Sequence, residues 1–331
     1  MNKNINLFLK NNTALKSIKG SWKLYNVQKK LGALNVTLRN DEIDTEKINS
    51  AIMLIKKHTS IISNFRGANI LTTAILISLE DDMENSLKEI ISIYDRLKQE
   101  FSISEYLIIA AQIIFSSRNI MNIDDAIKNT KTAYKYMKKN HRFLTGSEDI
   151  ASAALIATTS INLEKTFKDI EECYTLLKSK SNSSRNNIQA LSHILSLVNL
   201  PSENKCRKVL DMQSALKENN IPLKSYYLPV LGIVSFLTNN ISEFAEKAAN
   251  ITQDLKSCNG FGTFSIDSQL RNMISVSLAS MDYLNNLDDD LKLHLINSTS
   301  NMTLTVVSAI ETSIIAASCA ATAAASASSS S

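Results

Sequence analysis

The stretch ENSLKEIISIYDRLKQE, residues 84–100, carries the pattern that decides the fold. Its apolar side chains recur at steps of 3, 1, 3 and 3, and they are Leu87, Ile90, Ile91, Tyr94 and Leu97. This spacing is typical of an amphipathic helix that buries one face. The stretch closes on Leu97-Lys98 and then enters a short polar loop, which makes this dipeptide a marker of the end of the predicted helix.

The same marker recurs along the chain. An apolar residue followed by lysine closes six comparable stretches, at Ile55-Lys56, Leu97-Lys98, Met137-Lys138, Leu177-Lys178, Leu216-Lys217 and Leu255-Lys256. Successive lysines lie 42, 40, 40, 39 and 39 residues apart. A period this regular is the signature of a repeat architecture.

A second kind of stretch follows each polar loop and is more apolar and rich in small residues. Its six copies span 66–79, 104–117, 147–160, 187–198, 225–237 and 268–280. A helix that is apolar on most faces is typically buried between neighbours. We therefore expect a two-helix repeat, with a kink or a late helix start at Pro229.

Stacked helical hairpins predict the fold class, because a single hairpin cannot bury its apolar face alone. We expect an all-α, solenoid-like array of about six two-helix repeats, each of roughly 40 residues, with helical caps. The whole chain, 1–331, would form one domain, with an N-terminal cap at 1–40, six hairpins at 41–280 and a C-terminal cap with an Ala/Ser tail at 281–331. Glycine and proline, at 7 and 3 residues, are too scarce for many β-turns. The pattern leaves open whether the array is an open superhelix or a closed toroid.

Charge and cysteine content indicate which partners and which cellular compartment to expect. The net charge is only +4 and no long basic block occurs, which argues against a nucleic-acid partner. The cysteines at 173, 206, 258 and 319 are scattered and no signal peptide precedes them, so we expect free thiols and a cytoplasmic location. Residues 302–325 are long enough to cross a bilayer, but Glu311 near their centre favours a helix packed on the last repeat over a membrane anchor.

Several loop and helix segments resemble a known family. They are NFRGANILTTAILISLEDD (64–82), HRFLTGSEDIASAALIA (141–157), ALSHILSL (190–197), KC (205–206) and YYLPVLGI (226–233). In this order they are similar to the bacterial domain-of-unknown-function family numbered 4003, over nearly the whole chain. The resemblance implies a single full-length domain and no assigned activity. One departure is Ile150, which stands where the family pattern places an aromatic residue after two acidic ones.

Two groups of loop residues are candidates for a site. His141 and Asp149 in the third repeat and His193 in the fourth could supply imidazole and carboxylate ligands to a divalent metal. The competing interpretation makes Glu148 a capping residue, Asp149 a first-turn residue placed for the helix dipole, and His193 a core histidine. The latter is favoured, so no metal or cofactor is expected.

Phe65-Arg66-Gly67 is the second group. Arginine beside glycine at a helix N-terminus could bind an anion through its guanidinium and free backbone N–H groups. The competing interpretation is a turn at Gly67, with Phe65 packed inward and Arg66 paired with an acid such as Asp81. The full set of candidate binding residues is Phe65, Arg66, Gly67, His141, Phe143, Glu148, Asp149 and His193.

The function predicted from these features is a non-enzymatic helical-repeat module that binds a protein or peptide. No dinucleotide-binding, P-loop, zinc-protease or nucleophile-elbow signature occurs, which weighs against an enzyme. The alternative is a metal- or anion-binding small-molecule enzyme that uses His141, Asp149, His193 and Arg66. The module hypothesis predicts aromatic or arginine side chains exposed on one face of the array.

Overall fold

The computed structural model describes residues 2–18, 26–67, 69–160 and 162–284. All regular elements in these ranges are helices, which confirms the all-α prediction. The chain divides into two compact units: unit 1 comprises residues 1–6 and 159–331, and unit 2 comprises residues 7–158. Each unit is described by itself.

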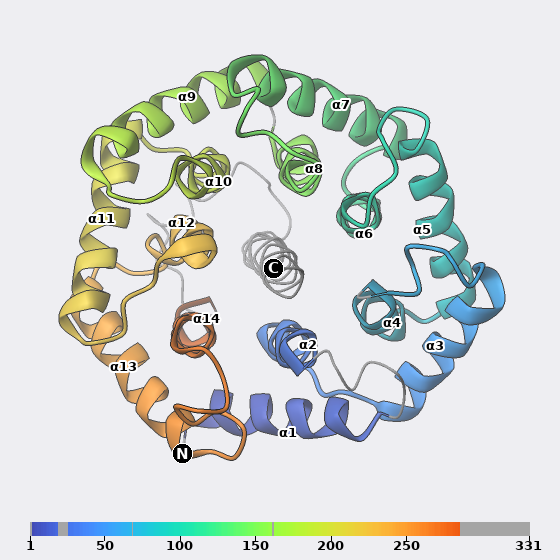
Figure 1. The fold of residues 1–331 in the computed structure, drawn as a ribbon, viewed down its shortest axis with the longest axis horizontal. Helices are drawn as coiled ribbons and strands as arrows, with labels where there is room; N and C mark the ends of the chain where they lie inside the picture. Colours follow the sequence, from blue (N-terminus) through green and yellow to red (C-terminus); the bar gives the residue numbers. More distant parts are fainter. Residues whose placement is uncertain (1, 19–25, 68, 161, 285–331) are drawn as a thin grey trace, which may run out of the picture. The chain divides into compact units, whose positions relative to one another are not determined.

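Unit 2 consists of helices in two layers. They are α1 (Lys3–Ser17, whose first residues belong to unit 1), α2 (Asn26–Leu38), α3 (Thr45–His58), α4 (Asn69–Ser78), α5 (Met83–Leu97), α6 (Tyr106–Ser116), α7 (Ile123–Asn140) and α8 (Asp149–Thr159). Figure 1 shows α3, α5 and α7 following one another in a first layer, while α2, α4, α6 and α8 form a second layer seen end-on. Contacts of α3 with α5, α5 with α7, and α4 with α6 join neighbouring hairpins.

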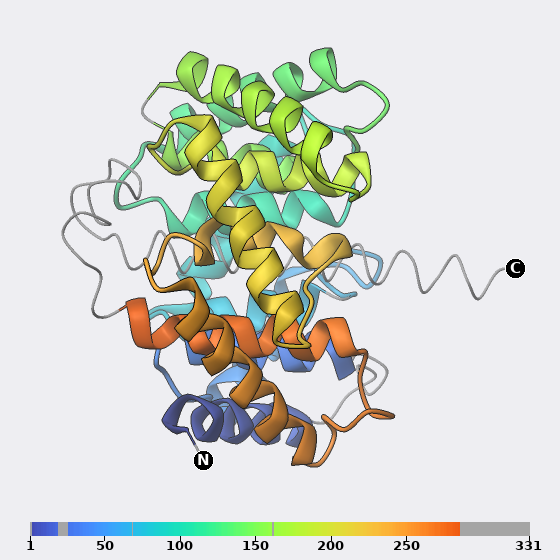
Figure 2. The same ribbon diagram turned by 90° about the vertical axis from the view of Figure 1, so that its left-hand side faces the viewer.

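Unit 1 repeats this arrangement. Its helices are α9 (Leu163–Lys180), α10 (Arg185–Leu195), α11 (Ser202–Glu218), the 3-10 helix η2 (Ser225–Val230), α12 (Leu231–Val234), α13 (Ile241–Ser257) and α14 (Ser268–Leu284). The first-layer helices α9, α11 and α13 pack in sequence, and Figure 2 shows α11 and α13 side by side. The helix–helix contacts of both units fit the predicted repeat array.

The apolar-lysine dipeptides mark the ends of the first-layer helices, as predicted. The apolar members Ile55, Leu97, Met137, Leu177, Leu216 and Leu255 are each at most 1% exposed. The lysines that follow them fall in the last turn or at the C-cap, where a cation complements the helix dipole. In α5 the buried face contains Ile93, whereas Ile91 is half-buried.

First-layer helices also begin in a common way. The side chain of an Asp or Asn N-cap accepts hydrogen bonds from first-turn backbone N–H groups in five of them, through Asp44, Asp82, Asn122, Asn162 and Asn240. Helix α11 differs, because its N-cap is Pro201, which makes no side-chain capping bond.

Departures from the predicted repeat have local causes. Pro229 lacks a backbone N–H, and the stretch around it forms the 3-10 helix η2 followed by the single-turn α12, which confirms the predicted late helix start. The predicted N-terminal cap contains a further helix pair, α1 and α2. No helix in the described part of the chain is long and apolar enough to cross a membrane, and residues 302–325 lie outside that part.

Candidate functional site

Phe65-Arg66-Gly67 lies in the loop between α3 and α4. Phe65 is buried against the ring of Tyr94, edge to face, with ring centroids 5.2 Å apart. The guanidinium of Arg66 donates to the carbonyl oxygens of Lys56 and Thr59 at 2.5 and 2.6 Å and to the hydroxyl of Thr59 at 3.0 Å. Arg66 therefore caps the C-terminus of α3, where the last carbonyls lack helical partners. Gly67 is exposed.

The loop from His141 to Asp149 connects α7 to α8. His141 is the half-buried C-cap of α7, Phe143 is 97% exposed, and Glu148 is exposed. Asp149 is buried at the start of α8, and its carboxylate accepts from the backbone N–H of Gly146 at 2.9 Å. Burial raises the pKa of Asp149 to about 7, although the hydrogen bond from the Gly146 N–H acts to lower this pKa.

The third member of the hypothetical metal set, His193, belongs to unit 1. It is buried in α10, whereas His141 and Asp149 belong to unit 2. The described residues contain no group of three or more His, Cys, Asp or Glu side chains that could hold a metal ion.

Exposed apolar side chains gather in one kind of loop. Seven large apolar residues are exposed in the described ranges, and five of them lie in loops that lead from a first-layer to a second-layer helix. Unit 2 has four of the five, in three successive loops: Ile61 and Ile62 after α3, Ile103 after α5, and Phe143 after α7. We call these four residues the apolar loop row.

Two repeated contacts place these loops at one edge of unit 2. Phe65 in the first loop packs on Tyr94 of α5, and Phe101 in the second packs on Tyr134 of α7, with centroids 5.4 Å apart. In addition, the side-chain amide of Asn69 donates to the carbonyl of Glu105 at 3.1 Å, which joins the start of α4 to the residue before α6. Paired aromatic residues thus anchor the first two of these loops, while the exposed apolar side chains of the loops stay in solvent.

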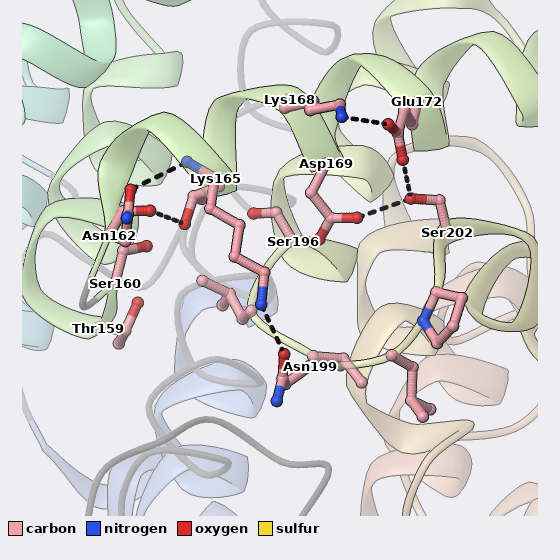
Figure 3. Close-up of a pocket in the computed structure, with 15 residues that line it drawn as sticks. Thr159, Ser160, Asn162, Lys165, Lys168, Asp169, Glu172, Ser196, Asn199 and Ser202 are labelled. Atoms are coloured by element: carbon pink, nitrogen blue, oxygen red, sulfur yellow. Dashed lines mark hydrogen bonds and ion pairs between the residues drawn. The ribbon is translucent and has the colours of Figure 1, made fainter.

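A cavity of about 520 Å³ lies in unit 1, among the first three turns of α9, the loop 196–201 and the start of α11. Lys165, Asp169 and Glu172 line it from one face of α9, because residues spaced by four and three positions share a helix face. Figure 3 shows Lys165 and Asn199 at one end of the cavity and Glu172 and Ser202 at the other, with Asp169 between them. A volume of this size is typical of sites for small molecules.

A buried ion pair adjoins the cavity. Lys205 is 0% exposed, and its ammonium group contacts the carboxylate of Asp169 and donates to the carbonyl of Val198 at 3.1 Å. The other carboxylate oxygen of Asp169 accepts from the hydroxyl of Ser202 at 2.8 Å. Lys205 therefore compensates the charge of Asp169 from the protein interior.

Two thiols pack beside this pair. The Sγ of Cys206 lies 3.7 Å from the carbonyl oxygen of Cys173, and a hydrogen bond with the Cys173 thiol lowers the pKa of Cys206. The same contact, together with burial, raises the pKa of Cys173. Both are free thiols, as is Cys258, in agreement with the sequence prediction, and Cys319 lies outside the described residues.

The sequence contains a signal for this cavity that motif searches miss. Lys205 stands eleven residues before Leu216, and the same position in the three repeats directly before it is filled by Ser86, Ala126 and Thr166. All three are buried in the structure. A lysine at a position that holds a small, buried neutral residue in the three repeats directly before it needs a compensating partner, which indicates a charged group on the neighbouring helix.

Comparison with known proteins agrees with the resemblance found in the loops. A family model described as "Protein of unknown function (DUF4003)" matches residues 11–313. The chain belongs to this family. Two of the segments that carry the resemblance, 190–197 and 205–206, contribute Ser196 and Leu197 to the cavity lining and Lys205 to its buried ion pair.

A curated relative is also uncharacterised. The chain is 23% identical over 204 residues to a protein of Bacillus subtilis (strain 168) named "Uncharacterized protein YeaA". The match covers 59% of this chain and spans 61% of the length of the relative. No solved structure matches the chain.

Proposed function

We propose that this member of the family is a cytoplasmic, non-enzymatic module that binds a partner protein through the apolar loop row of unit 2. The observation that carries the proposal is the recurrence of exposed Ile and Phe side chains at one edge, in three successive loops. Single exposed apolar residues are normal, whereas a row of them on adjacent loops is typical of an interaction surface.

The chemistry of the partner follows from the charges beside the row. Lys57, Lys139 and Arg142 are exposed at or just after the ends of α3 and α7, close in sequence to the apolar loop row, and they outnumber the exposed carboxylates of Glu100 and Glu148 there. An apolar segment flanked by carboxylates would complement both features, since like charges against this edge would be repelled. The partner is therefore expected to be an acidic, amphipathic protein segment.

The energy available is sufficient for recognition. Fully burying an Ile or Phe side chain contributes roughly 1.5 to 3 kcal/mol. The four residues of the row would contribute about 6 to 12 kcal/mol before the cost of ordering the loops, which is enough for a specific complex.

Site-specific photo-crosslinking tests the proposal in the native cell. A benzoylphenylalanine placed at position 143 should give a discrete adduct with one protein. The same probe at position 120 is the matched control, because Ile120 is also exposed in unit 2 but lies in a loop of the opposite kind, between α6 and α7.

The contribution of the remaining row residues is measured with the purified partner. The double variant Ile62→Ser/Ile103→Ser should weaken binding by about tenfold or more, and Met53→Ser/Ile120→Ser should leave it within about twofold. Identical adducts from positions 143 and 120 would refute the proposal. An adduct between two copies of the chain would replace it with self-association.

A further inference from the structure

We propose that the cavity in unit 1 is a separate binding site for an elongated zwitterion, a small molecule with an ammonium group at one end and a carboxylate at the other. This site is independent of the apolar loop row. The arrangement that supports it is a row of opposite charges on one face of α9, facing the loop 196–201 across a cavity of about 520 Å³.

The ammonium end is defined by three oxygen atoms. The hydroxyl oxygen of Ser202 lies 2.8 Å from a carboxylate oxygen of Asp169 and 2.8 Å from one of Glu172. A hydroxyl has one proton, so it can donate to only one of the two carboxylates. At the other contact two oxygen atoms face each other without a shared proton, and an ammonium group beside them could donate one N–H to each.

The protein's own cations leave this position to a ligand. Lys205 is fully buried and neutralises Asp169 from the interior, through the carboxylate oxygen that does not contact Ser202. Lys168 approaches Glu172 only to 3.8 Å and is largely exposed, so this pair contributes little and is easily exchanged. Glu172 therefore provides the negative charge that a ligand ammonium would meet.

The carboxylate end lies at the other side of the cavity. Lys165 extends its ammonium group toward the side chain of Asn199, 3.1 Å away, in the first turn of α9 (Figure 3). The positive end of the helix dipole and the lysine both favour an anion there. Asn199 can remain a neighbour of the lysine while the ligand carboxylate accepts a second N–H of the same ammonium group.

The separation of the two ends sets the length of the ligand. Lys165 and Glu172 are seven residues apart on α9, which corresponds to two turns, or about 10 Å between their backbone positions. An α-amino acid is too short to reach both side chains. A chain of several methylene groups between the charges, as in an ω-amino acid, matches the span and would contact the apolar parts of Leu197, Val198 and Leu200 in the lining.

Calorimetric titration of the full-length protein with 6-aminohexanoate tests this inference. Hexanoate, hexylamine and glycine are the comparison ligands, because they lack the ammonium, the carboxylate and the separation, respectively. We expect 6-aminohexanoate to bind at least about tenfold more tightly than each of the three. An absence of binding by 6-aminohexanoate, or equal binding by hexylamine or hexanoate, would overturn the assignment.

Matched variants locate the site. Lys165→Met and Glu172→Gln should each weaken binding by about tenfold or more, since each removes one charged contact. The controls Lys178→Met and Glu218→Gln change exposed residues outside the cavity and should bind as the unaltered protein does. Circular dichroism confirms that all four remain folded. Equal affinity in Lys165→Met and Lys178→Met would refute the proposed carboxylate end, and with it the zwitterion.

Discussion

Replacing Lys205 by methionine should destabilise the protein strongly, because this side chain is fully buried and pairs with a carboxylate. The change removes the ammonium group that compensates Asp169 and donates to the carbonyl of Val198. Breaking a buried ion pair by removing one partner costs about 3 to 5 kcal/mol. The side chain of Asp169 is 18% exposed and keeps its bond from Ser202, so the lower end of this range, about 3 kcal/mol, applies.

Urea unfolding followed by circular dichroism measures this loss. With a slope of roughly 3 kcal/mol per molar urea, a loss of about 3 kcal/mol lowers the unfolding midpoint by about 1 M. The control Lys178→Met, on the exposed face of α9, should shift it by less than about 0.2 M.

A double variant separates the ion pair from simple loss of packing. In Lys205→Met/Asp169→Leu both charges are gone, so stability should recover to within about 1 kcal/mol of the unaltered protein. Additive losses in the double variant would show that the two charges do not interact. A midpoint for Lys205→Met equal to that of Lys178→Met would refute the burial of the pair.

Two further changes test other parts of the structure. Asp149 has a pKa of about 7 when folded and 3.8 as its ordinary value, so between these values only the folded chain keeps the proton and the free energy of unfolding falls as pH rises. Asp149→Asn should therefore gain stability relative to the unaltered protein as the pH rises from about 4 to about 7, by up to about 4 kcal/mol, and a pH-independent difference in urea unfolding would contradict this. Gly232→Ala should cost about 1 to 3 kcal/mol in the same assay, because the new Cβ would lie 2.8 Å from a methyl carbon of Ile194; an unchanged midpoint would show that α10 can move away.

Local spacing predicted most of the fold. The apolar-lysine period located every first-layer helix from α3 to α13, because a helix buries residues three and four positions apart and a repeat preserves that face. Pro229 delayed the start of the α-helix to Leu231, because its missing N–H cannot join a regular helical ladder. The choice between Ile91 and Ile93 on α5 was less well determined, since both lie near the border of the apolar face and only neighbouring helices decide which is covered.

The binding roles of the candidate site residues stay predictions. Phe143, one of these candidates, is 97% exposed. Arg66 was placed at an anion site or beside Asp81, whereas the structure uses it to cap α3, because its guanidinium reaches carbonyls ten and seven residues earlier in the chain. The roles proposed for His141, Glu148 and His193 in binding stay predictions.

The sequence by itself determined the helices, their order and the repeat that stacks them, because these depend on contacts within a few residues. Only the tertiary structure brought Asp169 to Lys205, 36 positions away, and turned Ser202 toward α9 instead of capping its own helix. It also decided that Phe65 and Phe101 are anchored on tyrosines of the next hairpin while Ile61, Ile62 and Ile103 remain in solvent. Hydrophobicity alone does not separate these two groups, because what distinguishes them is the presence or absence of a neighbouring surface, which exists only after the hairpins pack.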